Sequence, residues 1–368
     1  MAMSGAREGC TRVATMIGQL TQGGTEKQLY LFLAHCDRQR WSPIVYVSRG
    51  PLGRWEEPIH QLGIPIILLE GRAWERLWQF RRSCRALQVR RFFSWSAHTN
   101  VYGLALWGLG IYRVGSFRNE FAFELAGSYP WIRSWACLAG VDAIVCNSQE
   151  TTAAVCRRAG DHQRVVYIPN SVESVERQGY HRLQWRRRLG LHDDEVFILG
   201  VGRLAPQKNF ARFVQAIALV RRDAPVRAAI AGRDDGCLES LRQEVQRLGL
   251  DAETIRFIGP VPNAQELMCA ADIFVLSSDR EGMPNVVLEA MAVGVPCVCT
   301  RVGGVSDLIT PGVDGLIVDR RPEALAAAIR LLAQDQALRQ SMGARALKRI
   351  GNAFAPQTIA GQLWQVLE

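Results

Sequence analysis

The sequence predicts an α/β protein of two doubly wound, Rossmann-like domains that face each other across a cleft. Short β-branched runs alternate with longer segments whose apolar residues recur at three- and four-residue spacing. This is the pattern of a parallel sheet with helices on both faces. The chain has 368 residues, of which 48% are hydrophobic, and this is enough for two cores of ordinary domain size.

The order of these segments divides the chain. We expect an N-terminal domain in residues 1–172, a linker in 173–192, a C-terminal domain in 193–350 and a last helix in 351–368 that packs back on the N-terminal domain. The linker is predicted because the chain becomes polar and charged there and loses the alternation. Strands are predicted at 12–17, 42–48, 64–70, 90–96, 112–117, 142–148, 196–202, 227–232, 255–259, 273–278, 295–300 and 315–318, and helices at 25–36, 74–90 and 211–222.

The net charge of +9 is concentrated in the first half of the chain. Residues 1–172 contain 20 Lys and Arg against 12 Asp and Glu, residues 173–192 contain five against two, and residues 193–368 contain 19 against 21. An anionic partner of the first domain is therefore expected. Paired zinc fingers and an aromatic RNA-binding strand are missing, which argues against nucleic acid as that partner.

Cysteine spacing and hydropathy indicate the compartment. The ten cysteines show no zinc-ligand spacing, so we expect reduced, buried thiols in a cytoplasmic protein. No apolar run is long enough for a transmembrane helix, and a peripheral position on the inner face of a membrane is the expected alternative to a purely cytoplasmic one.

The first loop of interest, LTQGGTEKQL, follows the first strand and opens the first helix. Gly23 and Gly24 would let backbone N–H groups approach an anion, and the helix N-terminus adds roughly half a positive charge. A plain strand-to-helix turn explains the same residues equally well.

The loop after the strand at 196–202 allows two interpretations. GVGRLA loosely matches a dinucleotide fingerprint, which would make Asp234 or Asp235 the acid that binds a ribose. Arg203 and Lys208 instead favour a diphosphate that is bound by charge as well as by backbone amides. A pair of solvated surface cations is the plainer alternative.

Two carboxylates bracket another such loop. Glu281 follows the strand at its carboxyl end, and Glu289 lies on the next helix. Between them, Gly282 and Met283 can offer backbone N–H groups, and Pro284 suits a first helical turn. Carboxylates accept hydrogen bonds from vicinal hydroxyls of a ribose or a hexose, although a capping acid and an unrelated surface acid would look the same.

Together these motifs resemble the retaining glycosyltransferases of family 4, which have the two-domain GT-B fold. The resemblance rests on GGTE (23–26), IPNSV (168–172), VGRLAPQKN (201–209), EGMPNVVLE (281–289), AMAVGVPCV (290–298) and VGGVSDLI with GLIV (302–318). It spans nearly the whole chain and is strongest from 196 to 320. The Glu-x7-Glu segment with its upstream cations is specific, whereas the Gly-Gly loop alone is not.

The resemblance implies the ligands of the donor diphosphate. Arg203 and Lys208 would bind it, and Gly24, beside Gly23, would touch it from the facing domain. These cations would offset the charge that grows on the leaving nucleoside diphosphate. Neither a divalent metal nor a cofactor is therefore expected. The adjacent acids of GRDDG (232–236) lack the spacing of a metal-binding Asp-x-Asp triplet, so we expect them to cap a helix.

The resemblance also implies the sugar and nucleoside contacts. Glu289 would bind the ribose hydroxyls. Glu281 would bind the transferred sugar, together with the backbone amides of residues 282–284. The nucleobase would lie near Ile258 and would be read largely through backbone groups.

One position departs from the family pattern. Where members often have a His near the anomeric carbon, this chain has Arg118, and His98 lies one strand earlier. Either side chain is a candidate for a catalytic or acceptor contact, although a lone His is more often structural.

The helix predicted at 74–90 has a face of a different kind, with Trp74 and Trp78 beside Arg81, Arg82 and Arg85. Tryptophan next to arginine suits a lipid headgroup interface. A solvated basic face is the alternative.

The sequence therefore predicts a retaining hexosyltransferase that uses a UDP- or GDP-sugar and a glycan or polyprenyl-linked lipid acceptor, in cell-surface polysaccharide synthesis. An anionic membrane surface is an expected partner. An epimerase of nucleotide sugars with the same fold, a non-catalytic nucleotide-binding module and an NAD-dependent oxidoreductase are the competing interpretations.

Overall fold

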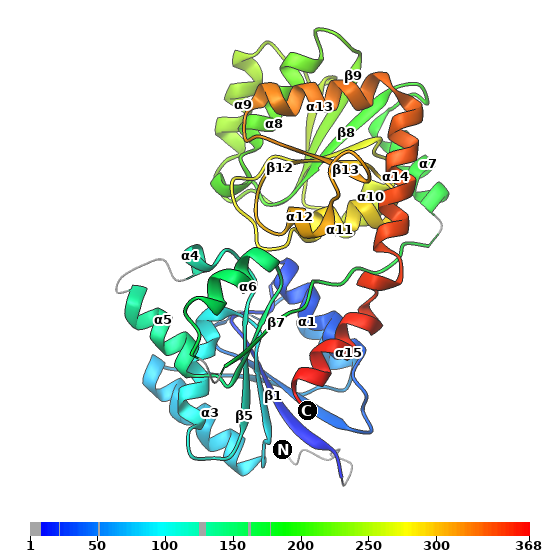
Figure 1. Cartoon of the computed structure of the whole chain (residues 1–368). Helices are drawn as coiled ribbons and strands as arrows, with labels where there is room; N and C mark the ends of the chain where they lie inside the picture. The colour runs from blue at the N-terminus through cyan, green and yellow to red at the C-terminus, as the bar shows by residue number, and fades with distance from the viewer. Residues whose placement is uncertain (1–8, 22, 51, 125–129, 161–162, 177) are drawn as a thin grey trace. The chain divides into compact units, whose positions relative to one another are not determined.

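The computed structural model describes residues 9–21, 23–50, 52–124, 130–160, 163–176 and 178–368. The chain folds into two compact units (Figure 1). Unit 1 consists of Met1–Ser171 and Pro356–Glu368, and unit 2 consists of Val172–Ala355.

Unit 1 is built on a sheet of seven parallel strands in the order β3-β2-β1-β4-β5-β6-β7. The strands are β1 Thr11–Ile17, β2 Trp41–Val47, β3 Ile66–Leu68, β4 Arg91–Ser94, β5 Tyr112–Phe117, β6 Ala143–Cys146 and β7 Arg164–Tyr167. The helices are α1 Gly24–Ala34, α2 Glu56–Gln61, α3 Ala73–Ala86, the 3-10 helix η1 Ala97–Leu106, α4 Phe121–Glu124, α5 Pro130–Ala139, α6 Gln149–Cys156 and α15 Pro356–Val366.

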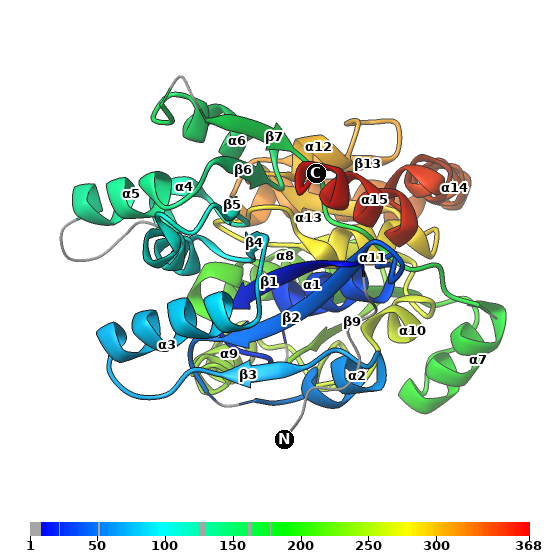
Figure 2. The same ribbon diagram turned by 90° about the horizontal axis from the view of Figure 1, so that it is seen from below.

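Both faces of this sheet are buried, which is why its strands are apolar without alternation. Val13 and Ile17 of β1 belong to the core beneath α1, α2 and α15, whereas Ala14 and Met16 belong to the core beneath α3 and η1. Figures 1 and 2 show α1 and α15 on one side of the sheet and α3 on the other.

The C-terminal helix α15 belongs to unit 1 through aromatic stacking. The ring of Trp364 stacks on Phe32 at 4.2 Å and on Trp41 at 5.3 Å between centroids. Burial of a large apolar side chain stabilises a fold by roughly 1.5–3 kcal/mol. The Arg91 side chain also donates hydrogen bonds to the Leu367 and Glu368 carbonyls.

Unit 2 contains a sheet of six parallel strands in the order β10-β9-β8-β11-β12-β13. The strands are β8 Val196–Val201, β9 Val226–Ala231, β10 Ile255–Gly259, β11 Ile273–Leu276, β12 Cys297–Thr300 and β13 Gly315–Val318. The helices are α7 Gln178–Leu189, η2 Pro206–Lys208, α8 Phe210–Val220, α9 Leu238–Arg247, α10 Ala264–Met268, α11 Asn285–Ala292, α12 Val305–Leu308, α13 Pro322–Gln334, α14 Gln336–Ile350 and η3 Asn352–Phe354.

The segment expected to be a linker, 173–192, instead belongs to unit 2 and contains α7. Arg186 is buried and donates to Asp272 at 3.1 Å, and Arg182 donates to the same carboxylate at 2.8 Å. Asp272 also accepts the backbone N–H of Phe197 at the start of β8. Charged residues that indicated a solvated linker thus attach α7 to the sheet.

Every end of a predicted strand lies within two residues of the observed end, and β7 is the described strand that was not predicted. All ten cysteines are free, and six of them are buried. Burial raises the pKa of Cys84 and of Cys146 to about 12. Within the described ranges, no helix is long and apolar enough to cross a membrane.

Candidate functional site

Several of the predicted site residues follow strands at the two points where the strand order reverses. In unit 2 the reversal lies between β8 and β11, and in unit 1 it lies between β1 and β4. Ligands of doubly wound sheets bind outside the carboxyl ends of strands at such a point. The loops after β8 and β11 carry Arg203, Lys208 and Glu281, and the loops after β1 and β4 carry Gly24 and His98.

In unit 2, Lys208 and Glu281 contact each other directly. Their Nζ and Oε1 atoms are 2.6 Å apart, and the two side chains are only 14% and 9% exposed. The Ser278 hydroxyl donates to the same Oε1 at 2.6 Å, and the Ser277 hydroxyl donates to the Lys208 carbonyl at 2.9 Å. The loops after β8 and β11 are therefore joined by the ion pair and by the Ser277 hydrogen bond, whereas Ser278 holds Glu281 within its own loop.

A second carboxylate fixes the same two loops. Asp279 accepts hydrogen bonds from Arg212 at 2.7 Å and from Asn209 at 3.0 Å, and its own backbone N–H donates to the Gln207 carbonyl. Asn209 adopts a left-handed conformation with φ 43° and caps α8 by accepting the Arg212 N–H. Asn tolerates this conformation better than most residues. Sequence reasoning missed Asp279 and Arg212, although Asp279 lies two residues before Glu281.

Arg203 does not join the Lys208–Glu281 pair. Its guanidinium donates to Asp235 at 2.6 Å and is half exposed, and Arg233 donates to the other oxygen of Asp235 at 2.9 Å. The hydrogen bonds from Arg233 and Arg203 lower the pKa of Asp235 below its ordinary value. The partner of Arg203 thus comes from the end of the neighbouring strand β9.

Asp234 stabilises the start of α9 through hydrogen bonds. Its Oδ1 accepts the backbone N–H groups of Gly236, Cys237 and Leu238, which open α9. The expectation that GRDDG caps a helix is confirmed. These contacts also weaken the dinucleotide interpretation, because each candidate ribose acid already has protein partners. Among the residues that are described, no cluster of His, Cys, Asp and Glu could hold a metal ion.

The segment from Glu281 to Pro284 is buried and lies against another loop. A Cβ atom on Gly304, which has φ +70°, would come within 1.9 Å of the Gly282 carbonyl oxygen. Only glycine fits this position. Pro284 is the N-cap of α11 rather than a residue of its first turn, and Glu289 lies on α11 with 9% of its surface exposed.

Ile258 lies at the carboxyl end of β10, next to a shift in the pairing with β9 between Phe257 and Gly259. The Gly259 carbonyl accepts the Gly232 N–H at 2.8 Å. The backbone around Ile258 is thus placed at the same sheet edge as the loops of Arg203 and Lys208.

In unit 1, the glycine loop opens α1 as the sequence predicted. Gly23 is the N-cap and Gly24 is the first helical residue, and Gly23 makes no side-chain cap hydrogen bond. A Cβ atom on Gly23 would come within 2.2 Å of the Glu26 carboxylate. His98 lies at the same edge, since a Cβ atom on Gly18, directly after β1, would come within 2.6 Å of its Nε2 atom.

Arg118 lies in the loop after β5 and has an unusual environment. Its guanidinium stacks over the Trp95 ring at 3.9 Å, and its Nη1 donates to the Asn170 amide oxygen at 3.3 Å. Its Nε and Nη2 atoms are buried and have no hydrogen-bond partner among the described residues. Burial lowers the pKa of Arg118 to about 9, so the guanidinium remains charged at neutral pH.

Glu124 ties the loops of Arg118 and His98 together, and sequence reasoning missed it. One carboxylate oxygen accepts the Arg118 N–H at 2.8 Å, and the other accepts the Ala97 N–H at 3.2 Å. Burial raises the pKa of Glu124 to about 7, although these backbone N–H donors and the charge of Arg118 oppose the shift.

Comparison with known proteins supports the family resemblance that the motifs indicated. Residues 22–175 match the sequence profile of Glycosyltransferase Family 4, and residues 181–349 match that of Glycosyl transferases group 1. A D-inositol 3-phosphate glycosyltransferase of Geodermatophilus obscurus is 35% identical over 224 residues, which cover 56% of this chain and 49% of the relative. The lipopolysaccharide core biosynthesis glycosyltransferase LpsD of Rhizobium meliloti is 29% identical over 77% of this chain and 76% of its own.

The match to the first of these relatives spans about half of its length. The crystal structure of HepE of Anabaena in complex with UDP and glucose has the same fold, with a TM-score of 0.85 over 97% of this chain and 99% of that chain, at 19% identity.

The Lys208–Glu281 pair predicts a coupled stability effect. We expect Lys208→Met and Glu281→Gln each to lower the free energy of unfolding by roughly 3 kcal/mol, because each leaves a buried charge without its partner. The double variant should lose clearly less than the sum. Urea unfolding measures all three, and purely additive losses would contradict the coupling. As a control, Arg233→Met in the more exposed pair with Asp235 should cost under about 1 kcal/mol.

The raised pKa of Glu124 predicts a pH-dependent stability. The folded chain keeps this proton between about pH 4.5 and pH 7, where the unfolded chain has released it, so the contribution of Glu124 falls as the pH rises through this range. Relative to Glu124→Gln, the wild type should lose up to about 3 kcal/mol between pH 4.5 and pH 8. Thermal melts across this range measure the difference, and a curve as flat as that of the exposed-site control Glu150→Gln would refute it.

Proposed function

The chain belongs to the group 1 glycosyl transferases of family 4, and on this basis we propose that it transfers a hexose from a UDP- or GDP-sugar to a glycan or lipid-linked acceptor. The proposed setting is the synthesis of a cell-surface polysaccharide, with retention of the anomeric configuration. The observation that carries the proposal is the Lys208–Glu281 pair, at the carboxyl ends of β8 and β11 and near Arg203.

Lys208 can contact a diphosphate without losing its carboxylate partner. An ammonium group has three N–H donors, of which one points to Glu281 Oε1. The remaining donors are available to phosphate oxygens. Because the side chain is already fixed by Glu281, little rotamer entropy would be lost when the diphosphate binds.

Glu281 is suited to a sugar hydroxyl in the same way. Both contacts of its carboxylate, from Lys208 and from Ser278, fall on Oε1. Within the described part of the chain, Oε2 has no hydrogen-bond partner, so it can accept from a hydroxyl. Glu289, on α11, is the proposed acceptor for the ribose hydroxyls.

Arg203 supplies the second cation. Its exposed guanidinium uses Nη1 on Asp235, and a guanidinium has five donors in a planar fork that fits phosphate oxygens. As the glycosidic bond breaks, negative charge develops on the leaving nucleoside diphosphate, and Arg203 and Lys208 would stabilise it. The charge of a divalent metal is then not required.

In unit 1, Arg118 and His98 are the proposed acceptor-side contacts, and Gly23 and Gly24 the proposed backbone contacts to the diphosphate. The Nε and Nη2 atoms of Arg118 support its role, because they are buried without a partner among the described residues and such groups are costly unless a ligand satisfies them. We further propose that the enzyme works in the cytoplasm against an anionic membrane surface, where a polyprenyl-linked acceptor would be presented.

Nucleotide binding tests the proposal. We expect UDP or GDP, but not NAD, to bind, and Arg203→Ala and Lys208→Ala each to weaken binding by roughly 1.5–3 kcal/mol, since each removes a charge-assisted contact. Titration calorimetry measures the affinities. Arg222→Ala, an exposed arginine after α8 in the same unit, should leave them unchanged. Equal affinities in wild type and both site variants would remove these residues from the site.

Transfer should persist in excess chelator. A screen of UDP- and GDP-hexoses with mass-spectrometric detection would identify the donor, and the rate with that donor should be the same with and without EDTA. The reason is that two cationic side chains occupy the place of a metal at the diphosphate. Loss of transfer with EDTA, restored by magnesium or manganese, would overturn the proposed charge stabilisation.

A further inference from the structure

The tryptophans exposed on the described surface all lie in one part of unit 1. Trp74 and Trp78 of α3 are 65% and 58% exposed, Trp107 after η1 is 51% exposed, and Trp131 and Trp135 of α5 are 71% and 59% exposed. Tryptophan is rarely left in water, and a cluster of this kind marks an interaction surface.

The three elements that carry these side chains are neighbours. Arg81 of α3 donates to the Ala105 carbonyl of η1 at 2.6 Å and to the Trp107 carbonyl at 2.8 Å. On the other side of η1, a Cβ atom on Gly103 would come within 1.8 Å of the Gly140 carbonyl, directly after α5. Figures 1 and 2 show α3 and α5 on the side of unit 1 away from α15. We call this the tryptophan face.

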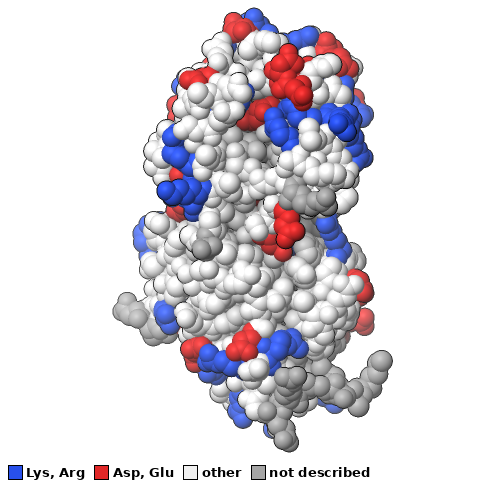
Figure 3. All heavy atoms as spheres, turned by 90° about the vertical axis from the view of Figure 1, so that its right-hand side faces the viewer, with Lys and Arg blue, Asp and Glu red and all other residues white. Residues whose placement is uncertain are grey.

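The charges on this face are mainly basic, although Glu75 of α3 lies between Trp74 and Trp78 in the sequence and accepts the Arg72 N–H. Arg82, Arg85 and Arg90 are exposed, and no carboxylate of the described residues forms an ion pair with them. The Arg82 guanidinium lies over the Trp78 ring at 5.3 Å. By contrast, the side of unit 1 that carries α1 and α15 shows basic and acidic side chains next to one another, and Arg40 pairs there with Glu368 (Figure 3).

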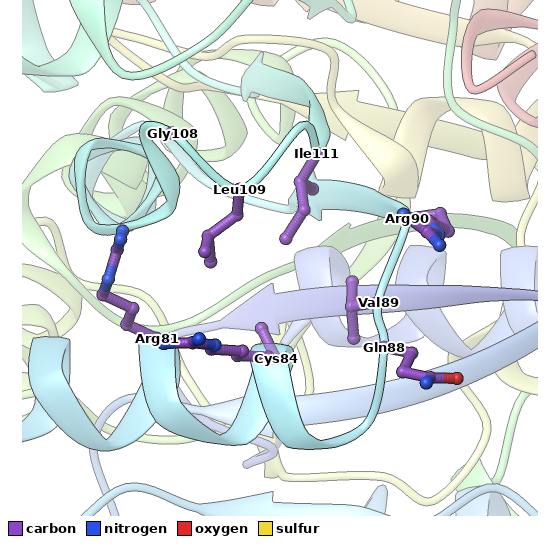
Figure 4. Close-up of a pocket in the computed structure, with 9 residues that line it drawn as sticks. Arg81, Cys84, Gln88, Val89, Arg90, Gly108, Leu109 and Ile111 are labelled. Carbon is purple, nitrogen blue, oxygen red and sulfur yellow. The ribbon is translucent and has the colours of Figure 1, made fainter.

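A pocket of about 430 Å³ opens within this face, between the end of α3 and the residues before β4 and β5 (Figure 4). Its apolar wall consists of Cys84, Val89, Leu109 and Ile111, and Arg81, Arg85, Gln88 and Arg90 complete the lining together with Gly108. Figure 4 shows Leu109, Ile111 and Val89 around the space, with Arg81 and Arg90 on opposite sides of it. Basic side chains around an apolar wall fit a phosphate that is attached to a hydrocarbon.

We propose that this pocket binds the phosphate headgroup of an anionic lipid and that the tryptophan face rests on the bilayer around it. This inference rests on the proposed function only in placing the acceptor at a membrane. Tryptophan rings settle at the headgroup level, and cations near an anionic surface are attracted by its potential. A protein partner would satisfy the tryptophans equally well, but the excess of exposed arginines beside them favours an anionic lipid surface.

Vesicle co-sedimentation of the full chain tests the inference. Wild type should sediment with phosphatidylcholine vesicles that contain phosphatidylglycerol at low salt, and should be released by high salt and stay unbound with phosphatidylcholine alone. Arg85→Glu with Arg90→Glu should weaken binding at least ~30-fold. The matched control, Arg187→Glu with Arg222→Glu, changes the same charge on exposed arginines of unit 2 and should change affinity less than about threefold.

Brominated lipids test the depth of the tryptophans. They should quench the fluorescence of wild type, and the quenching should fall by at least half in Trp74→Ser with Trp78→Ser but not in Tyr180→Ser with Leu183→Ser, which are exposed apolar residues of α7.

Four outcomes would overturn the inference. The first is that wild type stays in the supernatant at low salt, and the second is that the control variant loses vesicle binding as strongly as the pocket variant. The third is that brominated lipids do not quench the tryptophan fluorescence, and the fourth is that the chain self-associates through its tryptophans and does not bind vesicles. UDP calorimetry on the same variants separates this inference from the proposed function. A pocket variant that binds UDP normally but no vesicles supports the inference, whereas normal UDP binding with no vesicle binding in wild type removes the lipid site alone.

Discussion

The parallel pairing of strands is the constraint on which the rest of the structure depends. Hydrogen bonding in parallel register brings the carboxyl ends of all strands to one edge of a sheet. In unit 2, that edge collects the loops after β8, β9, β10 and β11, although they are spread over about a quarter of the chain. Where the order reverses, between β8 and β11, the connections from the two adjacent strands lead to opposite faces of the sheet, and Lys208 meets Glu281 there. The chemistry of the site is therefore a consequence of topology first and of side chains second.

The charged side chains at the carboxyl edge of the sheet have different partners in the two units. In unit 2, the acidic and basic side chains neutralise one another, as in the pairs Lys208–Glu281 and Arg203–Asp235, and each pair leaves donors or acceptors that face outward. In unit 1, the guanidinium of Arg118 lies over the Trp95 ring and donates to Asn170, and its Nε and Nη2 atoms are buried with no partner among the described residues. A buried N–H without an acceptor costs roughly 1–3 kcal/mol. Buried polar groups without partners at a sheet edge are typical of binding sites, where the usual requirement that buried N–H groups be hydrogen-bonded is often not met.

Much of the fold could be predicted because the strands are buried on both faces and read as continuous apolar runs. The strand β7 was not predicted because it is short and begins with the exposed Arg164, so its apolar run is only three residues long. The helix α7 was not predicted because its arginines, which are bound to Asp272 in the structure, cannot be distinguished in the sequence from solvent-exposed arginines. The sequence predicted which loops form the candidate site, but it did not predict which side chains in these loops contact one another. Whether Arg203 faces Lys208 or Asp235 depends on rotamers, and the approach of Gly304 to Gly282 depends on packing between loops 22 positions apart. Glu124 carries no motif, and only its burial next to Arg118 reveals it.

The geometry of unit 1 also keeps its two candidate sites apart. The lipid pocket is lined by Arg90 and Ile111, which come directly before β4 and β5, whereas His98 and Arg118 come after the same strands. The six residues of β5, Tyr112–Phe117, span roughly 20 Å at about 3.3 Å per residue. This is about 2.5 times the Debye length at physiological salt, so exposed charge at one end of the strands is largely screened from exposed charge at the other. A headgroup in the pocket would therefore neither compete with nor repel a ligand at Arg118, and attachment to a surface and binding at the sheet edge can proceed independently in one small domain.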